Sequence, residues 1–192
     1  MKHKELYIYD FDDTLASTDS VIKVIKKNGE TYTITSQEYN CSYKKDDTDL
    51  LDVSSCRKLV NPREIKPVTD LLKNSVKEHG LKSSVILTYR ANPKPVREFL
   101  EMFKLPPIEI HTLGLDWEII PANMSVLPED IRKTLDDKGA WILKRINEYK
   151  IEEVYFYEDS EKYLNSVKAI KDKVPDTKIT LYLVKNGQIY DF

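Results

Sequence analysis

Glycine is scarce in this chain. Its 192 residues contain five glycines, far below the roughly 7% of average usage. The closest pair, Gly114 and Gly139, is 25 positions apart. A Gly-x-Gly-x-x-Gly turn or a Walker loop needs glycines within a few residues of each other. The sequence therefore excludes the glycine-lined loops that hold the phosphates of dinucleotides and nucleoside triphosphates.

Other absences narrow the class of protein further. No apolar run approaches the 18 residues of a membrane-spanning helix, and the N-terminal segment turns acidic before a signal-peptide core could form. Cys41 and Cys56 make no Cys-x-x-Cys pair, which favours reduced thiols in a cytoplasmic protein. The three histidines are scattered, so we expect no zinc site. The net charge of −2 argues against large-scale wrapping of nucleic acid, although a local patch could bind a strand end.

Short apolar runs alternate with helical periodicity over most of the chain. Helical spacing of apolar residues recurs at 68–76, 96–103, 142–149 and 163–170. The runs predicted as strands are continuous rather than alternating, which is typical of strands covered on both faces. They are Glu5–Asp10, Ser84–Thr88, Ile108–Thr112, Glu153–Tyr157 and Ile179–Val184. The pattern predicts an α/β fold, a three-layer, doubly wound, mostly parallel Rossmann-like sheet within one domain covering residues 1–192.

Two stretches do not follow this alternation. About 50 residues separate the first strand from the first helix, which is too many for a plain connection. Within them Asn28-Gly29 joins Val21–Lys26 to Glu30–Thr35 and predicts a β-hairpin. We therefore expect an insertion at about 15–62, with a hairpin flap and a small cap, whose segment 37–55 has no clear pattern. The stretch 113–137 has no sustained period either, whereas 188–192 is predicted to return as an antiparallel edge strand after Asn186-Gly187.

Acidic and polar residues follow three of the predicted strands. Asp10 and Asp12 end the first, Thr88 ends the second, and Glu158 and Asp159 follow the fourth. In a doubly wound sheet, ligands bind beyond the carboxyl ends of the strands, so these residues should meet at one edge. Close carboxylates repel unless a cation neutralises them, and a few hard oxygen ligands suit Mg²⁺ that shares a phosphate. An isolated Asp-x-Asp is more often a simple acidic turn, and the matching residues after the other strands favour a site instead.

Such a site has the chemistry for phosphoryl transfer. A carboxylate beside the metal can attack phosphorus and form an aspartyl-phosphate. Its neighbour can protonate the leaving oxygen and then deprotonate the water that hydrolyses the intermediate.

The motifs resemble those of the haloacid dehalogenase (HAD) superfamily. The segment YIYDFDDTLA resembles its first motif, VILTYR its second and VYFYEDSEKYLNSV its acidic fourth, over about the first 170 residues. Within the superfamily the chain is similar to small phosphatases of bacteriophages and, more loosely, to the phosphatase half of polynucleotide kinase-phosphatases. The resemblance implies a Mg²⁺-dependent, HAD-like phosphatase with a flap after the first motif. It also implies that the protein is located in the cytoplasm, which is the host cytoplasm if a phage encodes the chain. The resemblance implies neither a membrane nor an obligate protein partner.

The resemblance also implies roles for individual residues. Asp10 corresponds to the nucleophile and Asp12 to the general acid/base, and the Asp10 side chain, the Asp12 carbonyl and Asp159 would hold the metal. Thr88 would bind a phosphoryl oxygen. The third motif is a lysine that binds phosphate, for which we choose Lys138 over Lys133 and Lys144.

Two residues of this site have more than one interpretation. Arg90 stands where the family often has an arginine, and it either clamps the substrate or pairs with Glu158. Glu158 either tunes the metal or hydrogen-bonds the backbone.

The predicted function is hydrolysis of a phosphomonoester, either a small molecule or a nucleic-acid terminus. The resemblance favours a nucleotide or a phosphorylated nucleic-acid end. Four lysines in the insertion either meet such a polyanion or are solvated surface residues; they are Lys26, Lys27, Lys44 and Lys45. The alternatives are a phosphatase of small sugar phosphates and a non-catalytic HAD-like binding module. A dehalogenase is disfavoured because that branch lacks the second aspartate, and a phosphomutase usually carries a larger cap.

Overall fold

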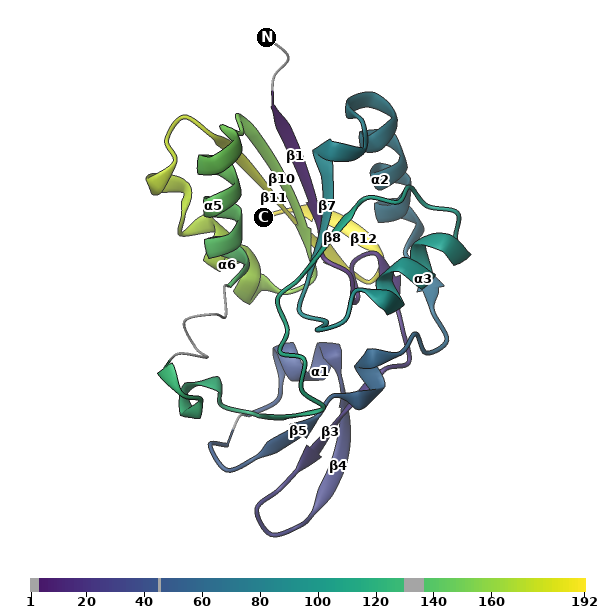
Figure 1. The fold of residues 1–192 in the computed structure, drawn as a ribbon, viewed down its shortest axis with the longest axis vertical. Coiled ribbons are helices and arrows are strands. Elements are labelled where there is room, and N and C mark those ends of the chain that lie inside the picture. The colour runs from purple at the N-terminus through teal and green to yellow at the C-terminus, as the bar shows by residue number, and fades with distance from the viewer. Residues whose placement is uncertain (1–3, 45, 130–136) are drawn as a thin grey trace.

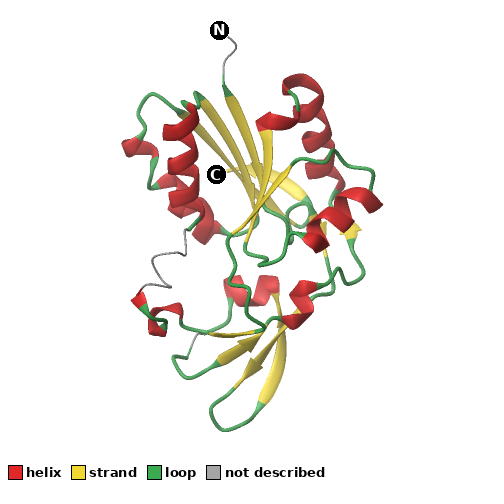
Figure 2. Cartoon of the chain, viewed as in Figure 1, coloured by secondary structure: helices red, strands yellow, loops and turns green. Residues whose placement is uncertain are grey.

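The computed structural model describes residues 4–44, 46–129 and 137–192 and has a mixed α/β architecture around a six-stranded sheet (Figures 1 and 2). The strand order is β12-β11-β10-β1-β7-β8, and all neighbours are parallel except the β11–β12 pair. The strands are β1 (Glu5–Tyr9), β7 (Ser84–Thr88), β8 (Glu109–Thr112), β10 (Glu153–Glu158), β11 (Lys178–Lys185) and β12 (Gln188–Asp191). The prediction of a mostly parallel sheet is confirmed, and each predicted strand is present within one residue at either end.

The antiparallel edge strand follows from a tight turn. Asn186 and Gly187 both have positive φ angles, of 52° and 72°, and they reverse the chain between β11 and β12. Two consecutive residues with positive φ match the right-handed twist of a two-residue hairpin, and Asn-Gly is the pair that adopts them most readily. The prediction of an antiparallel return strand is therefore confirmed.

Helices cover both faces of the large sheet. On one face α2 (Lys66–His79) and α3 (Lys94–Met102) bury Leu72 and Phe99 against β1 and β7. On the other face α5 (Lys138–Tyr149) and α6 (Glu161–Lys168) pack against Ile8 and Phe156. Figure 1 shows the two helix pairs on opposite sides of the strands. Side chains at odd and even positions of the same strand thus enter different cores, which explains why the strand sequences do not alternate between apolar and polar.

A second, four-stranded antiparallel sheet lies below the first in Figure 1. Its order is β4-β3-β5-β9, and its strands are β3 (Val21–Ile25), β4 (Thr31–Thr35), β5 (Leu50–Asp52) and β9 (Ile119–Pro121). The predicted hairpin is confirmed as the β3–β4 pair. β5 lies in the segment for which the sequence showed no pattern. β9 comes from the stretch 113–137, so this sheet takes one strand from outside the predicted insertion of 15–62.

Several short elements lie between the larger ones. β2 (Ala16–Ser17) pairs with β6 (Arg63–Glu64) where the chain enters and leaves the insertion. The helix α1 (Ser36–Cys41) follows β4 and begins at a capping box, in which Thr35 and Glu38 exchange hydrogen bonds. The remaining 3₁₀ turns are η1 (Ser54–Arg57), η2 (Leu81–Ser83), η3 (Met124–Val126) and η4 (Lys171–Lys173). Within the ranges that the structure covers, no helix combines the length and the apolar character needed to span a bilayer.

Candidate active site

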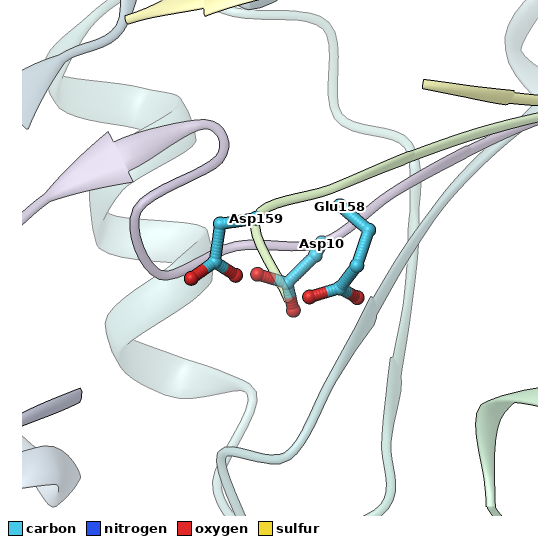
Figure 3. A group of neighbouring side chains, drawn as sticks. All are labelled: Asp10, Glu158 and Asp159. Atoms are coloured by element: carbon cyan, nitrogen blue, oxygen red, sulfur yellow. The ribbon is translucent and has the colours of Figure 1, made fainter. Parts of the chain in front are cut away.

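Three carboxylates meet at the carboxyl ends of two neighbouring strands. Asp10 follows β1, Glu158 is the last residue of β10, and Asp159 comes next. One carboxylate oxygen from each lies within 4.8 Å of the others, and Figure 3 shows the three groups gathered with Asp10 in the middle. β1 and β10 are adjacent although about 145 residues separate them, because the chain first builds β7 and β8 on one side of β1 and only then returns to its other side. A crevice forms beyond strand ends at such a reversal, and the predicted convergence of Asp10 and Asp159 is present there.

Lys138 completes the cluster. Its Nζ atom lies 2.6 Å from Oδ1 of Asp10 and 2.5 Å from Oε2 of Glu158, and its side chain is 1% exposed. The residue begins α5, where the carboxylate of Asp137 accepts a hydrogen bond from the Ala140 backbone and caps the helix. The structure thus places the preferred lysine in the site.

The two alternative lysines do not take that place. Lys144 is exposed on α5, and Lys133 lies outside the described residues.

Gly139 allows α5 to approach α6 closely enough to bring Lys138 inward. A Cβ atom on Gly139 would lie 2.7 Å from the carbonyl oxygen of Ser166, a distance that real Cβ atoms do not reach. Only glycine permits this approach without moving one of the helices. One of the five glycines therefore supports the site through helix packing rather than through a phosphate-binding loop.

The cluster is not electrically balanced. Three carboxylates face one ammonium group, so two negative charges have no counter-charge among the four side chains. Burial raises the pKa of Asp10 to about 8 against the opposing charge of Lys138, and burial with the charges of Asp10 and Glu158 raises the pKa of Asp159 to about 10. The two carboxylates raise the pKa of Lys138 above its usual range although burial alone lowers it. A buried group of this charge either takes up protons or binds a cation.

The position of Glu158 is compatible with both roles suggested by the sequence, a hydrogen bond to the backbone and an influence on a bound metal. Its Oε2 atom accepts from Lys138, and its Oε1 atom accepts from the backbone N–H of Ser160 at 3.2 Å. It therefore hydrogen-bonds the backbone and also lies beside the carboxylates that could hold a metal.

Arg90 pairs with Asp12 and not with Glu158. Its Nε and Nη2 atoms donate to the two carboxylate oxygens of Asp12 at 2.8 and 2.7 Å, and Nη1 donates to the carbonyls of Cys56 and Lys58 at 2.6 and 3.0 Å. Of the two interpretations of Arg90, the pair with Glu158 is not formed, and Glu158 pairs with Lys138 instead. Arg90 instead orients Asp12 and ties it to the end of η1 in the second sheet region. Because its donors are used within the protein, the structure gives no support to a direct clamp on the substrate.

A tight turn follows β1 and contains Asp12 and Asp13. The N–H groups of Leu15 and Ala16 both donate to the carbonyl of Phe11, and Asp13 has a positive φ of 59°. Asp and Asn adopt this left-handed conformation more readily than most residues other than glycine. The acidic run after the strand thus also meets the conformational demand of the turn.

Thr88 and the loop after β7 line the same cavity as the acidic cluster. The side chain of Thr88 is buried, and its Oγ1 accepts a hydrogen bond from the N–H of Arg90 at 3.1 Å, which leaves the hydroxyl proton to be donated. Gly114 crosses behind this loop so closely that a Cβ on it would lie 2.1 Å from the Tyr89 carbonyl oxygen. The close approach fixes the loop that carries both Tyr89 and Arg90.

A cavity of about 350 Å³ runs from the carboxylates to the second sheet. The predicted site residues Asp10, Asp12, Thr88, Arg90, Lys138 and Asp159 all line it. Its far wall includes Tyr39, Arg57, Trp117 and Met124, which the sequence did not single out. They lie in or beside the two stretches without periodicity, where an exposed aromatic residue gives no sign of what it faces.

The described lysines of the insertion are not among the residues that line this cavity. Lys26 donates to Asp49 at 2.7 Å, and Lys27 and Lys44 are exposed. Lys45 lies outside the described residues. These positions agree better with the interpretation that the lysines are solvated surface residues than with the interpretation that they contact a bound polyanion.

Comparison with known proteins adds no relative to this description. A scan against protein-family models, a search of curated proteins and a search of solved structures each gave no significant match.

Proposed function

We propose that this protein is a Mg²⁺-dependent phosphomonoester hydrolase that acts through an aspartyl-phosphate on Asp10. The observation that carries the proposal is the buried cluster of Asp10, Glu158, Asp159 and Lys138, in which three carboxyl groups lie beside one ammonium group at the end of a cavity. Oxygen ligands in a small carboxylate set suit Mg²⁺, which keeps several waters and shares oxygens with a phosphate. When bound, the ion would neutralise charge on the phosphoryl group and orient it for in-line attack.

The order of the strands is consistent with a doubly wound, HAD-like sheet, the finer fold that we propose. The chain adds β7 and β8 on one side of β1 and then β10 and β11 on the other, and the site lies where the direction reverses. The motif residues Asp10, Thr88, Lys138 and Asp159 come together at that place, which is what the sequence resemblance requires of its motifs.

The proposed reaction consists of two phosphoryl transfers. A carboxylate oxygen of Asp10 attacks phosphorus, a new O–P bond forms, and the bond from phosphorus to the alcohol oxygen breaks as that oxygen takes a proton from Asp12. A water molecule then loses a proton to Asp12 and attacks the same phosphorus. The O–P bond to Asp10 breaks, and free carboxylate and inorganic phosphate result.

Lys138 and Thr88 assist the phosphoryl group. The ammonium of Lys138 sets the position of Asp10 and offsets its charge, and the Thr88 hydroxyl donates to a phosphoryl oxygen. Both oxygens of Asp12 accept from Arg90, so proton transfer at Asp12 requires at least one of these contacts to open. Arg90 is therefore a positioning residue for the acid/base.

Phosphate release from p-nitrophenyl phosphate tests the proposal. We expect Mg²⁺-dependent release that chelation of the metal abolishes and that Asp10→Asn lowers by about 10³-fold or more, the scale seen when a nucleophile is removed. Asp13→Asn is the matched control, because asparagine accepts the positive φ of residue 13 and the change removes a neighbouring carboxylate of the same turn. Full activity of Asp10→Asn, or equal loss in both variants, contradicts the assignment of the nucleophile.

Asp12→Asn tests the covalent intermediate. The nitrophenolate group leaves without protonation, whereas hydrolysis of the intermediate needs a base. We expect one rapid equivalent of nitrophenolate followed by a stall, with phosphate on Asp10 detected by mass spectrometry after a denaturing quench. No phosphate on Asp10 in a protein that still turns over would exclude the aspartyl-phosphate route. A fold-competent protein that releases no phosphate from aryl phosphates or nucleotides would favour the non-catalytic binding module.

A further inference from the structure

Three aromatic rings lie close to the ammonium group of Lys138. Its Nζ atom is 5.1 Å from the ring centroid of Tyr163, 5.6 Å from that of Tyr89 and 5.8 Å from that of Phe156. An ammonium within about 6 Å of an aromatic centroid is attracted by the negative face of the ring, and most strongly where water is excluded. Lys138 is 1% exposed, so its contacts with the rings are shielded from water.

The three rings come from separate elements around the large sheet. Phe156 lies on β10, Tyr163 lies on α6, and Tyr89 follows β7. The rings of Tyr89 and Tyr163 also contact each other, with centroids 4.8 Å apart. Phe156 is fully buried in the hydrophobic core, whereas both tyrosines line the cavity. The tyrosines are therefore the rings that can be exchanged without emptying the core of the sheet.

Tyr89 contacts Lys138 at a second point. Burial raises the pKa of Tyr89 to about 12, while the charge of Lys138 and a hydrogen bond with the Lys138 backbone act in the opposite direction. A backbone hydrogen bond that lowers the pKa of a phenol is donated by an N–H group to the phenol oxygen. Lys138 is the first residue of α5, and its N–H has no acceptor within the helix. Tyr89 therefore holds both the start of the helix and the side chain that begins there.

The two carboxylates do not hold Lys138 equally in every state of the proposed reaction. An ammonium group has three N–H donors, and Asp10 and Glu158 each accept one hydrogen bond from Lys138. In the proposed reaction Asp10 becomes esterified with phosphate, and it has no carboxylate charge while the intermediate lasts. The negative faces of the rings do not change during these steps, so their attraction for the ammonium persists.

We propose that Tyr89 and Tyr163 are positioning residues whose ring faces hold the ammonium of Lys138 against its two carboxylate partners. They act through the lysine and not through a contact with the substrate. Their role in catalysis rests on the proposed function, but the attraction between the rings and the ammonium is a property of the folded chain. It can therefore be tested without turnover.

Fluorinated analogues of Tyr163→Phe test the attraction itself. Successive fluorine atoms weaken the negative face of the ring and leave its size nearly unchanged. We expect the urea midpoint of unfolding to fall stepwise from Tyr163→Phe to its mono-, di- and trifluorinated analogues. The same series at Phe103, whose ring packs against the ring of Phe99, is the matched control and should show no such fall. Absence of the stepwise fall at Tyr163, or an equal fall at Phe103, overturns the proposal.

A double-mutant cycle tests which group the ring attracts. Tyr163→Leu should lower the free energy of unfolding more in the wild-type protein than in Lys138→Met, which has no ammonium at this position. In Lys144→Met, which removes an exposed lysine of the same helix, Tyr163→Leu should keep its full effect. An equal effect in all three backgrounds overturns the proposal. If Lys138→Met does not fold, the fluorine series decides.

Steady-state kinetics test the role of the rings in the proposed reaction. With p-nitrophenyl phosphate and Mg²⁺, we expect Tyr163→Leu to lower kcat by about tenfold, a fold-change in the range of one desolvated contact between an ammonium and a ring. Tyr163→Phe, which keeps the ring, should stay within about twofold of the wild-type protein. Tyr89→Phe loses only the hydroxyl at the Lys138 backbone and should lose less activity than Tyr89→Leu. Equal losses in Tyr163→Phe and Tyr163→Leu overturn the role of the ring.

The outcomes separate this proposal from the proposed function. A stepwise fall in stability along the fluorine series, without phosphate release from any ester, supports the contacts between the rings and Lys138 and contradicts the hydrolase. Mg²⁺-dependent phosphate release from a protein whose stability and kcat do not change along the series supports the hydrolase and overturns the positioning role.

Discussion

The two sheets of this molecule differ in how firmly their residues are held. The large sheet is covered on both faces, and its site residues lie at the ends of β1, β7 and β10, of which β7 is buried along its whole length. In the described part of the chain, the core of the small sheet consists of five buried residues, Ile22, Val24, Ile34, Leu51 and Ala122. The acidic cluster is thus carried by the well-packed region, and the opposite wall of the cavity is carried by the thinly packed one. If the proposed hydrolase activity is correct, the second sheet is the part in which substrate preference can change at least cost to the fold.

The largest expected effect concerns the buried charge of the large sheet. Lys138→Met removes the single ammonium from a cluster of three carboxylates, and loss of one partner of a buried pair typically costs about 3–5 kcal/mol. Urea unfolding should show this loss, and Mg²⁺ should restore more stability to Lys138→Met than to the wild-type protein. Lys144→Met, on the exposed side of the same helix, is the control and should change little. Equal stability of the two variants would contradict the charge balance described here.

The corresponding ion pair of the small sheet should matter less. Lys26 binds Asp49, but the lysine side chain is 31% exposed, so water can replace much of the contact. Lys26→Met is therefore expected to destabilise the protein less than Lys138→Met does in the same urea titration.

Core truncations compare the packing of the two sheets directly. Phe99→Ala empties space in the core beneath α3 and should lower the free energy of unfolding by about 3–5 kcal/mol. Leu51→Ala, in the small sheet, should mainly increase amide hydrogen exchange and proteolysis within 21–53. If both variants shift one common unfolding transition and neither opens the small sheet locally, the two sheets form a single cooperative unit and the comparison fails.

A smaller effect is expected from the glycines. Gly114→Ala must displace the loop that carries Tyr89 and Arg90, at a cost of about 1–3 kcal/mol, and should lower phosphate release. In Gly29→Ala, in the β3–β4 turn, the new Cβ meets no neighbouring atom. The only expected cost is that of a φ of 87° in a residue other than glycine, roughly 1–2 kcal/mol. Its phosphate release should stay at the wild-type level. Thermal unfolding and steady-state kinetics on both variants separate the two positions.

The smallest effect concerns Cys56, at the junction of the two regions. Burial raises the pKa of its thiol to about 11, so the thiolate fraction at pH 8 is lower than that of an ordinary cysteine. In a Cys41→Ser background, the rate of alkylation by iodoacetamide should therefore keep rising with pH beyond 9. A rate that levels off below pH 9 would show that Cys56 is more exposed to water than the structure indicates.

Much of the large sheet could be predicted from the sequence because its determinants are local. Continuous apolar runs identified the strands, and each site carboxylate directly follows or ends a strand, so the parallel arrangement alone brings Asp10 and Asp159 together. The choice of Lys138 came from the family resemblance. The short strand β9 could not be predicted in the same way, because its three residues gain their partners from β5, some 70 positions earlier.

The sequence by itself determined the succession of strands and helices along the chain, the hairpin at Asn28-Gly29 and the acidic residues at the strand ends. These features depend on periodicity and turn chemistry. The tertiary structure decided which charges pair. Arg90 binds Asp12, 78 positions away, and Lys138 binds Glu158. It also decided that Trp117 and Tyr89 share one cavity. Two of the five glycines acquire their meaning in the same way: Gly114 and Gly139 allow close packing behind the site, a demand that only the folded chain creates.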